Sequence, residues 1–150
     1  MQILHFEYII CTQKITPILE NHMSFVILVT MLLLIQYIYF MMQVGKARGM
    51  ADLKAPAMSG DEHFERCSRV HMNTLEQLAI TLPAMWVCAV YFRADVAAIL
   101  GAVFLVGRFV YSAGYISDPT KRGTGMMIGF IANLALILIG LYIAIMQIAF

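Results

Sequence analysis

The feature that most constrains this chain is a set of four apolar runs, each about as long as a helix that crosses a lipid bilayer. The runs are Ser24–Met42, Val70–Phe92, Val96–Ser117 and Gly125–Phe150. A helix rises about 1.5 Å per residue, so roughly 20 residues cross the ~30 Å hydrocarbon core. The runs lack the polar alternation of membrane β-strands. The sequence therefore predicts an all-α integral membrane protein, a bundle of four transmembrane helices.

Composition supports this prediction and excludes several other classes. Hydrophobic residues make up 61% of the 150 residues and charged residues 13%, against about 45–50% and about 25% in soluble domains. The net charge of +1 indicates no attraction to nucleic acid. The three cysteines form no CxxC pair, which argues against a disulfide framework and a zinc site. His63 and His71 lack a metal-ligand spacing, so no metal site is predicted.

The connections between the runs predict an orientation in the membrane. Gly45–Glu65 and Asp118–Gly123 hold most of the lysines and arginines between runs, whereas Arg93 is the one basic residue in the remaining connection. By the positive-inside rule the two basic loops face the cytoplasm, and both termini face away from it. Ser59 and Asp61 both stand where they can cap a helix that begins in water and continues into the membrane.

The first 22 residues fit the pattern poorly. They contain Glu7 and lack a basic start, so they make a poor signal peptide. We therefore expect residues 1–22 to be an extension outside the fold and residues 23–150 to form the four-helix membrane domain.

Polar side chains line one face of the second predicted helix. At about 100° per residue, Glu65, Arg69, Asn73 and Glu76 fall within an arc of about 80°. A charged side chain within a bilayer costs on the order of 2.5–3.5 kcal/mol even on the lenient insertion scale. This polar stripe must therefore face a partner helix, a cavity or a ligand.

The third predicted helix repeats the pattern with Arg108, Tyr111 and Tyr115 within an arc of about 60°. Two interpretations remain open from the residues alone. The polar groups could join the helices, through an ion pair of Glu76 with Arg69 or Arg108 and a bridge by Asn73, or they could bind a ligand. Membrane proteins also place tyrosines at the interface, and basic loop residues such as Lys121 and Arg122 also act as topology signals.

Two segments resemble the MAPEG family, the membrane-associated proteins in eicosanoid and glutathione metabolism. Phe64–Gln77, FERCSRVHMNTLEQ, resembles the family's E-R-x-x-R-x-x-x-N-x-x-E signature. Val106–Tyr115 followed by Lys121–Gly125 is similar to the third helix and following loop of the microsomal glutathione transferase 2 and leukotriene C4 synthase branch. The resemblance extends from about Ser24 to the C-terminus.

The resemblance implies a homotrimer that binds glutathione, its co-substrate, between neighbouring subunits near the cytoplasmic face. It implies that Arg122 lies beside the glutathione sulfur as the catalytic residue. It also implies a set of glutathione-binding residues: Arg48, Arg69, Asn73, Glu76, Tyr111 and Tyr115. Arg108 is counted with this set, because it matches an arginine that the family retains near the site. Their chemistry fits, because arginines bind carboxylates bidentately and a cation near sulfur favours the nucleophilic thiolate.

The function that this resemblance implies is a membrane-bound glutathione transferase, with possible peroxidase activity, that acts on hydrophobic electrophiles or lipid hydroperoxides, as in detoxification. Gly49 and Gln77 replace an arginine and a tyrosine of leukotriene C4 synthase, which favours a general transferase over leukotriene synthesis. One alternative is a non-catalytic lipid-binding protein of the same fold. Another is a small proton-coupled transporter that uses Glu76, although a transporter has no need for Tyr115 and Arg122 at the membrane edge.

Overall fold

The computed structural model of this chain describes the backbone of residues 2–149 and the side chains of residues 22–149. It consists of α1 (Gln2–Met50), α2 (Glu62–Tyr91), α3 (Ala94–Ser117), the short 3₁₀ helix η1 (Pro119–Arg122) and α4 (Gly123–Ala149). Within the described residues, four helices are long and apolar enough to cross a membrane. The prediction of an all-α bundle with four membrane-spanning helices is confirmed.

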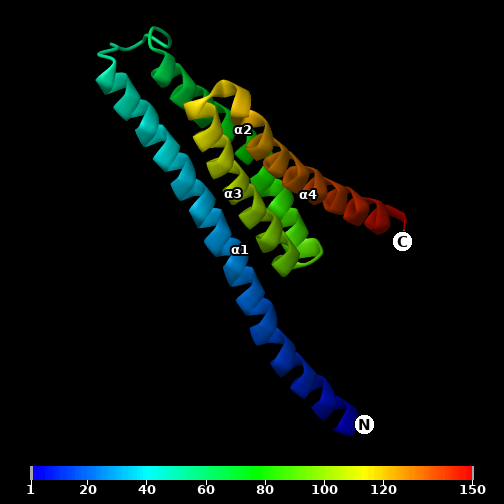
Figure 1. Cartoon of the computed structure of the whole chain (residues 1–150). Helices are drawn as coiled ribbons and strands as arrows, with labels where there is room; N and C mark the ends of the chain where they lie inside the picture. Colours follow the sequence, from blue (N-terminus) through cyan, green and yellow to red (C-terminus); the bar gives the residue numbers. More distant parts are fainter. Residues whose placement is uncertain (1, 150) are drawn as a thin grey trace.

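Two helices begin well before the apolar runs that predicted them. The backbone of α1 is helical from Gln2 onward, so the helix begins well before Ser24. The prediction that residues 1–22 lie outside the fold concerns residues whose side chains, up to residue 21, fall outside the described part, and it stays a prediction. In Figure 1 the N-terminal end of α1 projects beyond the other three helices.

The second helix begins in the polar loop at Glu62, before the apolar run. Asp61 is its N-cap, and its Oδ1 accepts a hydrogen bond from the Phe64 backbone N–H at 2.8 Å. Glu62 and Glu65 in the first turn add negative charge where the helix dipole favours it. The polar loop and the apolar run are therefore joined by one continuous helix, as the position of Asp61 predicted.

The third helix is the centre of the bundle, and it packs against α1, α2 and α4. Figure 1 shows α4 diverging from the other helices toward its C-terminal end. The core between the helices contains Leu33, Met85, Phe104 and Leu136, which are fully buried. Many apolar residues on the outer surface are exposed instead, as expected of helices whose outer faces contact lipid.

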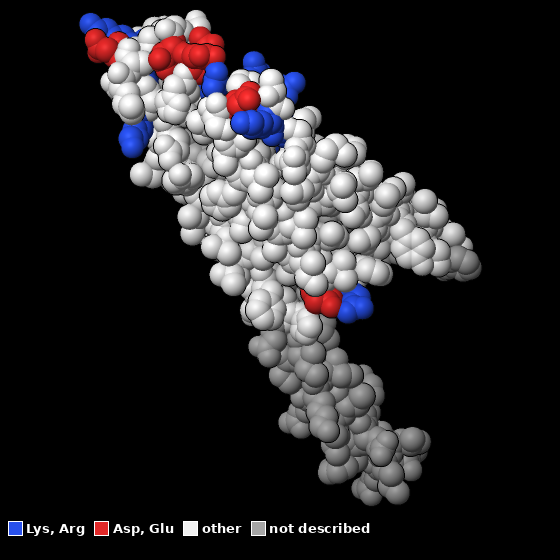
Figure 2. Space-filling view, in the orientation of Figure 1, with Lys and Arg blue, Asp and Glu red and all other residues white. Residues whose placement is uncertain are grey.

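Charged side chains gather at the two ends of the apolar body. On the face shown in Figure 2, most lie around the α1–α2 loop and near η1, and one pair of opposite charges lies at the other end of the bundle. Arg93 and Asp95 form an ion pair at the start of α3, at the end of the bundle away from the α1–α2 loop. An apolar belt separates the two groups, so the bundle presents a surface that a bilayer can surround.

Glycine allows α4 to approach α3 closely near the charged end. A Cβ added to Gly125 would lie 2.1 Å from the Tyr111 backbone nitrogen, a distance that no side chain can occupy. A Cβ added to Gly107 on α3 would lie 2.9 Å from Ile128 Cγ2 and 3.0 Å from the Gly129 backbone nitrogen of α4. This contact brings the tyrosine face of α3 next to η1 and the start of α4, where the candidate site lies.

Candidate functional site

A cavity of about 320 Å³ lies where α2, α3, η1 and the start of α4 meet. We call it the arginine pocket. Its lining consists of Arg69, Asn73, Tyr111, Tyr115, Arg122 and Met126. The structure thus brings together five of the eight residues singled out from the sequence. Met126 was missed, because an apolar residue early in an apolar helix carries no signal of its own.

Two arginines of this pocket have guanidinium groups without a partner in the described part of the chain. Arg69 and Arg122 are both exposed, and neither forms an ion pair or a hydrogen bond with any residue among residues 22–149. Unpaired arginines at one cavity attract anions, and their planar donors suit carboxylates. The arginine pocket is therefore suited to an anionic ligand.

The two tyrosines form one wall of the pocket. The rings of Tyr111 and Tyr115 stack with their centroids 5.6 Å apart and an angle of 13° between the planes. Tyr111 is buried and Tyr115 is half-buried, so the ring of Tyr115 is the more accessible. This stack is more than an interfacial belt of separate tyrosines, because it gives the pocket a flat apolar wall with phenol groups that can donate hydrogen bonds.

Arg108 lies on the buried side of the pocket and is only 2% exposed. Its Nε and Nη2 donate to Thr74 Oγ1 at 3.2 and 2.8 Å, and its Nη1 donates to Asn73 Oδ1 at 3.2 Å. Its guanidinium carbon also lies 4.2 Å from the centre of the Tyr111 ring. All of these partners are neutral. Arg108 therefore supports the lining residues Asn73 and Tyr111 and is not itself among the lining residues.

Asn73 connects Arg108 to Glu76. Its Nδ2 donates to Glu76 Oε2 at 3.3 Å, while its Oδ1 accepts from Arg108. Among residues 22–149 no ion pair within 4 Å joins Glu76 to Arg69 or Arg108. The ion pairs considered from the sequence are therefore not formed in the described part of the chain, but the bridge through Asn73 is. Because Glu76 is exposed, its carboxylate remains available to a cationic group.

Arg48 does not line the arginine pocket. Its Nη1 donates to the Ala57 carbonyl at 2.8 Å, and its guanidinium carbon lies 4.6 Å from the centre of the Phe64 ring. These contacts hold the end of α1 against the α1–α2 loop and the start of α2. Within one chain the structure thus separates Arg48 from the other site residues.

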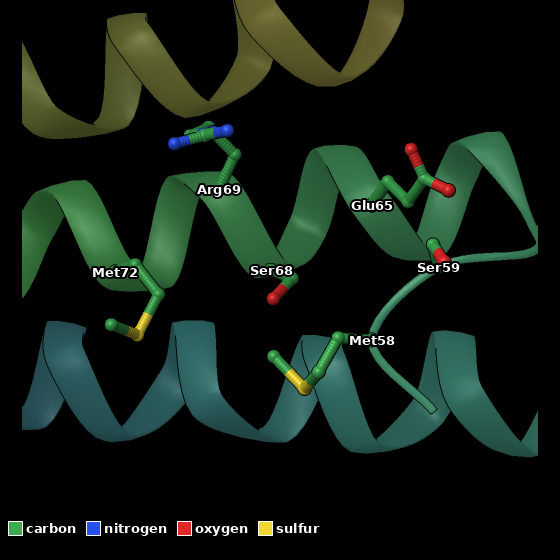
Figure 3. A pocket seen from close by; sticks show the side chains of 6 residues that line it. All are labelled: Met58, Ser59, Glu65, Ser68, Arg69 and Met72. Carbon is green, nitrogen blue, oxygen red and sulfur yellow. The ribbon is translucent and has the colours of Figure 1, made fainter. Parts of the chain in front are cut away.

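A second cavity, of about 280 Å³, shares Arg69 with the first. Its other lining residues are Met58 and Ser59 from the loop and Glu65, Ser68 and Met72 from α2. In Figure 3 the Arg69 side chain points away from Met58 and Met72. Glu65 Oε1 accepts from the Gly60 backbone N–H at 3.0 Å. The polar stripe of α2 therefore continues from the loop to the arginine pocket, and Arg69 belongs to both cavities.

The turn around η1 fixes the backbone next to Arg122. Asp118 Oδ1 accepts from the backbone N–H and the hydroxyl of Thr120, at 3.0 and 2.8 Å. The hydrogen bond from the Thr120 backbone is the main reason that the pKa of the Asp118 carboxyl lies below its ordinary value. Arg66 of α2 donates to the carbonyl of Ile116 at 3.1 Å, which ties the end of α3 to α2.

The MAPEG family model matches residues 26–142. This chain belongs to the MAPEG family. The resemblance to that family, noted for Phe64–Gln77 and for Val106–Tyr115 followed by Lys121–Gly125, is confirmed. The matched range includes all of α2 and α3, most of the membrane-spanning parts of α1 and α4, and the whole lining of the arginine pocket.

Three relatives show how close the similarity is. An uncharacterised protein of Synechocystis sp. is 43% identical over 73% of this chain and 80% of its own length. Microsomal glutathione S-transferase 2 of Homo sapiens is 38% identical over 68% of this chain and 71% of its own length. Leukotriene C4 synthase of Cavia porcellus is 33% identical over 69% of each chain.

Proposed function

We propose that this MAPEG protein is a membrane-bound glutathione transferase that binds glutathione in the arginine pocket and uses it as a thiolate. The observation that carries the proposal is the presence of two guanidinium groups, those of Arg69 and Arg122, at one cavity beside two stacked tyrosines, with no partner for either among residues 22–149. The names of two relatives, microsomal glutathione S-transferase 2 and leukotriene C4 synthase, support the same class of activity. The co-substrates are hydrophobic electrophiles, with lipid hydroperoxides as substrates of a peroxidase activity.

The polar groups of the site match those of glutathione. Glutathione has two carboxylates, one ammonium group and one thiol. Arg69 can bind a carboxylate through two parallel hydrogen bonds, and Glu76, oriented by Asn73, can accept from the ammonium group. The hydroxyl of Tyr115 can donate a hydrogen bond to the sulfur.

Arg122 is the proposed catalytic residue. A thiol has a pKa near ~8.5, and a cation beside it lowers that value because it stabilises the thiolate. The guanidinium of Arg122 is free of other partners in the described part of the chain, so its charge is available to the sulfur. The thiolate then attacks a lipophilic electrophile that enters from the bilayer.

In this proposal Arg48 contributes to glutathione binding only when the subunits assemble. The MAPEG resemblance implies a homotrimer with glutathione between neighbouring subunits, and Arg48 lies outside the arginine pocket of its own chain. We therefore assign Arg48 to the pocket of the neighbouring subunit, where it contributes a further carboxylate-binding guanidinium. In this arrangement the basic loops and the pocket face the cytoplasm, where the charge pattern predicts them to be.

The test uses full-length protein purified in detergent. Calorimetry measures glutathione affinity, and a chromogenic aryl halide reports transfer of the glutathionyl group. Wild-type protein is expected to bind glutathione and to form the conjugate. Arg69→Ala and Glu76→Ala should each weaken binding roughly tenfold, because each loses a charge-assisted hydrogen bond.

Arg93→Ala is the matched control, because Arg93 is an exposed arginine at the other end of the bundle and pairs with Asp95. It should leave glutathione affinity unchanged. Full affinity in a folded Glu76→Ala protein would show that the polar stripe joins helices without binding glutathione. Absence of both binding and conjugation in the wild type would reject the proposed function.

A further inference from the structure

A second polar cluster lies between α2 and α4, farther from the basic loops than the arginine pocket. It consists of Gln77, Thr81 and Asn133, and we call it the glutamine cluster. Gln77 is one helical turn beyond Asn73, and Asn133 is two turns beyond Met126, both in the direction away from the basic loops. Asn73 and Gln77 therefore lie on one face of α2, and Met126 and Asn133 lie on one face of α4. Thr81 is 0% and Asn133 5% exposed.

The hydrogen bonds of this cluster fix which way each amide points. Thr81 Oγ1 lies 2.8 Å from the Gln77 carbonyl and 2.7 Å from Asn133 Oδ1, but a hydroxyl has one hydrogen to donate. The Gln77 carbonyl already accepts the helical N–H of residue 81. We therefore assign the Thr81 hydroxyl hydrogen to Asn133 Oδ1. Asn133 Nδ2 in turn donates to Gln77 Oε1 at 2.9 Å.

The Nε2 group of Gln77 is left with both of its hydrogens. It has no acceptor among residues 22–149, and it is not sealed inside the protein. The buried polar side-chain atoms without a partner in that range are Gln36 Oε1, Arg66 Nε and His71 Nε2. An accessible amide donor at membrane depth has no water to satisfy it, and an unsatisfied polar group there is costly. A lipophilic molecule with an accepting oxygen would satisfy it.

We propose that Gln77 is a specificity-determining residue, and that its Nε2 donates to the carbonyl oxygen of a lipophilic α,β-unsaturated carbonyl substrate. The proposal rests on the proposed function, because glutathione in the arginine pocket supplies the nucleophile. Gln77 is about 6 Å along the α2 axis from the pocket residue Asn73. A lipophilic substrate that accepts a hydrogen bond from the accessible Nε2 of Gln77 therefore lies within reach of a thiolate bound in the arginine pocket, with its alkyl chain in the bilayer.

The chemistry gives this donor a role in the reaction as well as in binding. The glutathione thiolate forms a C–S bond at the β-carbon, and the π-electron pair of the C=C bond moves to leave negative charge on the carbonyl oxygen. Water then supplies a proton to the α-carbon, which yields the saturated thioether. A fixed donor at an oxygen that gains charge stabilises the transition state more than the ground state.

The test compares two electrophiles that differ in this oxygen: a long-chain 2-alkenal, and a benzyl halide that has none. In Gln77→Leu, kcat/KM for the alkenal should fall on the order of tenfold, while kcat/KM for the benzyl halide and the glutathione affinity stay near wild type. Asn133→Leu should act in the same direction, because the Gln77 amide loses its orienting partner. Gln36→Leu is the control, since Gln36 is a buried glutamine that donates to the Leu105 carbonyl at 3.0 Å, away from the pocket.

A binding measurement without turnover separates this inference from the proposed function. Calorimetry compares a long-chain 2-alkanone with an alkane of the same length, neither of which reacts with glutathione. Gln77→Leu should weaken the alkanone several-fold and leave the alkane unchanged. An equal loss for both electrophiles, or unchanged alkanone affinity, overturns the role of Gln77. A third outcome is that the wild-type protein binds the alkanone more tightly than the alkane, that Gln77→Leu removes this preference, and that neither electrophile is conjugated. That outcome would reject the proposed transferase function but support Gln77 as a carbonyl-binding residue.

Discussion

Arg108 Nη1 donates a hydrogen bond to Asn73 Oδ1 at 3.2 Å, which joins α3 to α2 on the buried side of the arginine pocket. The same asparagine donates to Glu76 at 3.3 Å. A buried cation on one helix thus orients an exposed carboxylate on another through a neutral amide. Arg108 therefore orients residues of the site although it does not line the pocket itself.

The first prediction concerns this connection. Arg108→Met should weaken glutathione affinity roughly tenfold, because Asn73 loses the donor that fixes its amide and Glu76 loses its orientation. Calorimetry on Arg108→Met, Asn73→Ala and the double variant forms a double-mutant cycle. We expect a coupling of about 1 kcal/mol or more between the two sites. Additive losses would show that Arg108 and Asn73 affect glutathione affinity independently, which would contradict the prediction.

The second prediction concerns the thiolate. A one-unit change in thiol pKa corresponds to about 1.4 kcal/mol and therefore to roughly a tenfold smaller thiolate fraction. Arg122→Ala should lower kcat by about that factor while glutathione affinity changes little, and the ultraviolet absorbance of the bound thiolate should fade. Arg122→Lys should recover part of both, since the charge matters more than the fork geometry at one sulfur. Unchanged rate and absorbance in Arg122→Ala would mean that another group activates the sulfur.

The third prediction concerns the close contact between α4 and α3. An added Cβ at Gly125 would lie 2.1 Å from the backbone nitrogen of Tyr111. Gly125→Ala should therefore lower the free energy of unfolding by roughly 1–3 kcal/mol, the usual cost of overpacking, and weaken glutathione binding. Gly123→Ala is the matched control, because nothing lies within 4 Å of its added Cβ. Thermal unfolding in detergent measures both variants, and equal midpoints would contradict the contact.

The fourth prediction follows from the lowered pKa of Asp118. Because the folded protein favours the carboxylate, its stabilising effect is complete above the unfolded pKa near ~3.9 and is lost as the pH falls through the lower folded value. Asp118→Asn should therefore lower the thermal midpoint at pH 7 and have little effect near pH 2. Asp52→Asn in the other basic loop serves as the comparison. A constant difference between wild type and Asp118→Asn across this range would contradict the prediction.

The fifth prediction concerns orientation in the membrane. With Cys11 replaced by serine, a single cysteine introduced at Ala55 should react with a membrane-impermeant reagent only from the cytoplasmic side. The native Cys67 and Cys88 are buried, so they should stay unlabelled in the folded protein. A cysteine at Arg93, in the opposite connection, should react only from the other side. Reversed labelling at both positions would invert the proposed topology.

The sequence by itself determined the class of fold, because length and hydropathy along the chain are enough to specify helices that cross a bilayer. The number and approximate positions of these helices follow from the four apolar runs. Asp61 also predicted a helix that begins in the polar loop. The periodicity of Arg69 and Asn73 on one helix, and of Tyr111 and Tyr115 on another, placed each pair on one face.

Only the tertiary structure decided which of these faces meet and which polar groups remain free. The periodicity of Arg108 was equally consistent with an ion pair to Glu76, but the packing of α3 on α2 gives it Thr74 and Asn73 instead. The glutamine cluster joins residues 56 positions apart in the chain, so no local pattern could reveal it. Helical periodicity assigns a side chain to a face of its own helix, whereas the partner of that side chain depends on the angle, depth and rotation of a neighbouring helix. Those quantities are set by packing contacts such as Gly125 against Tyr111.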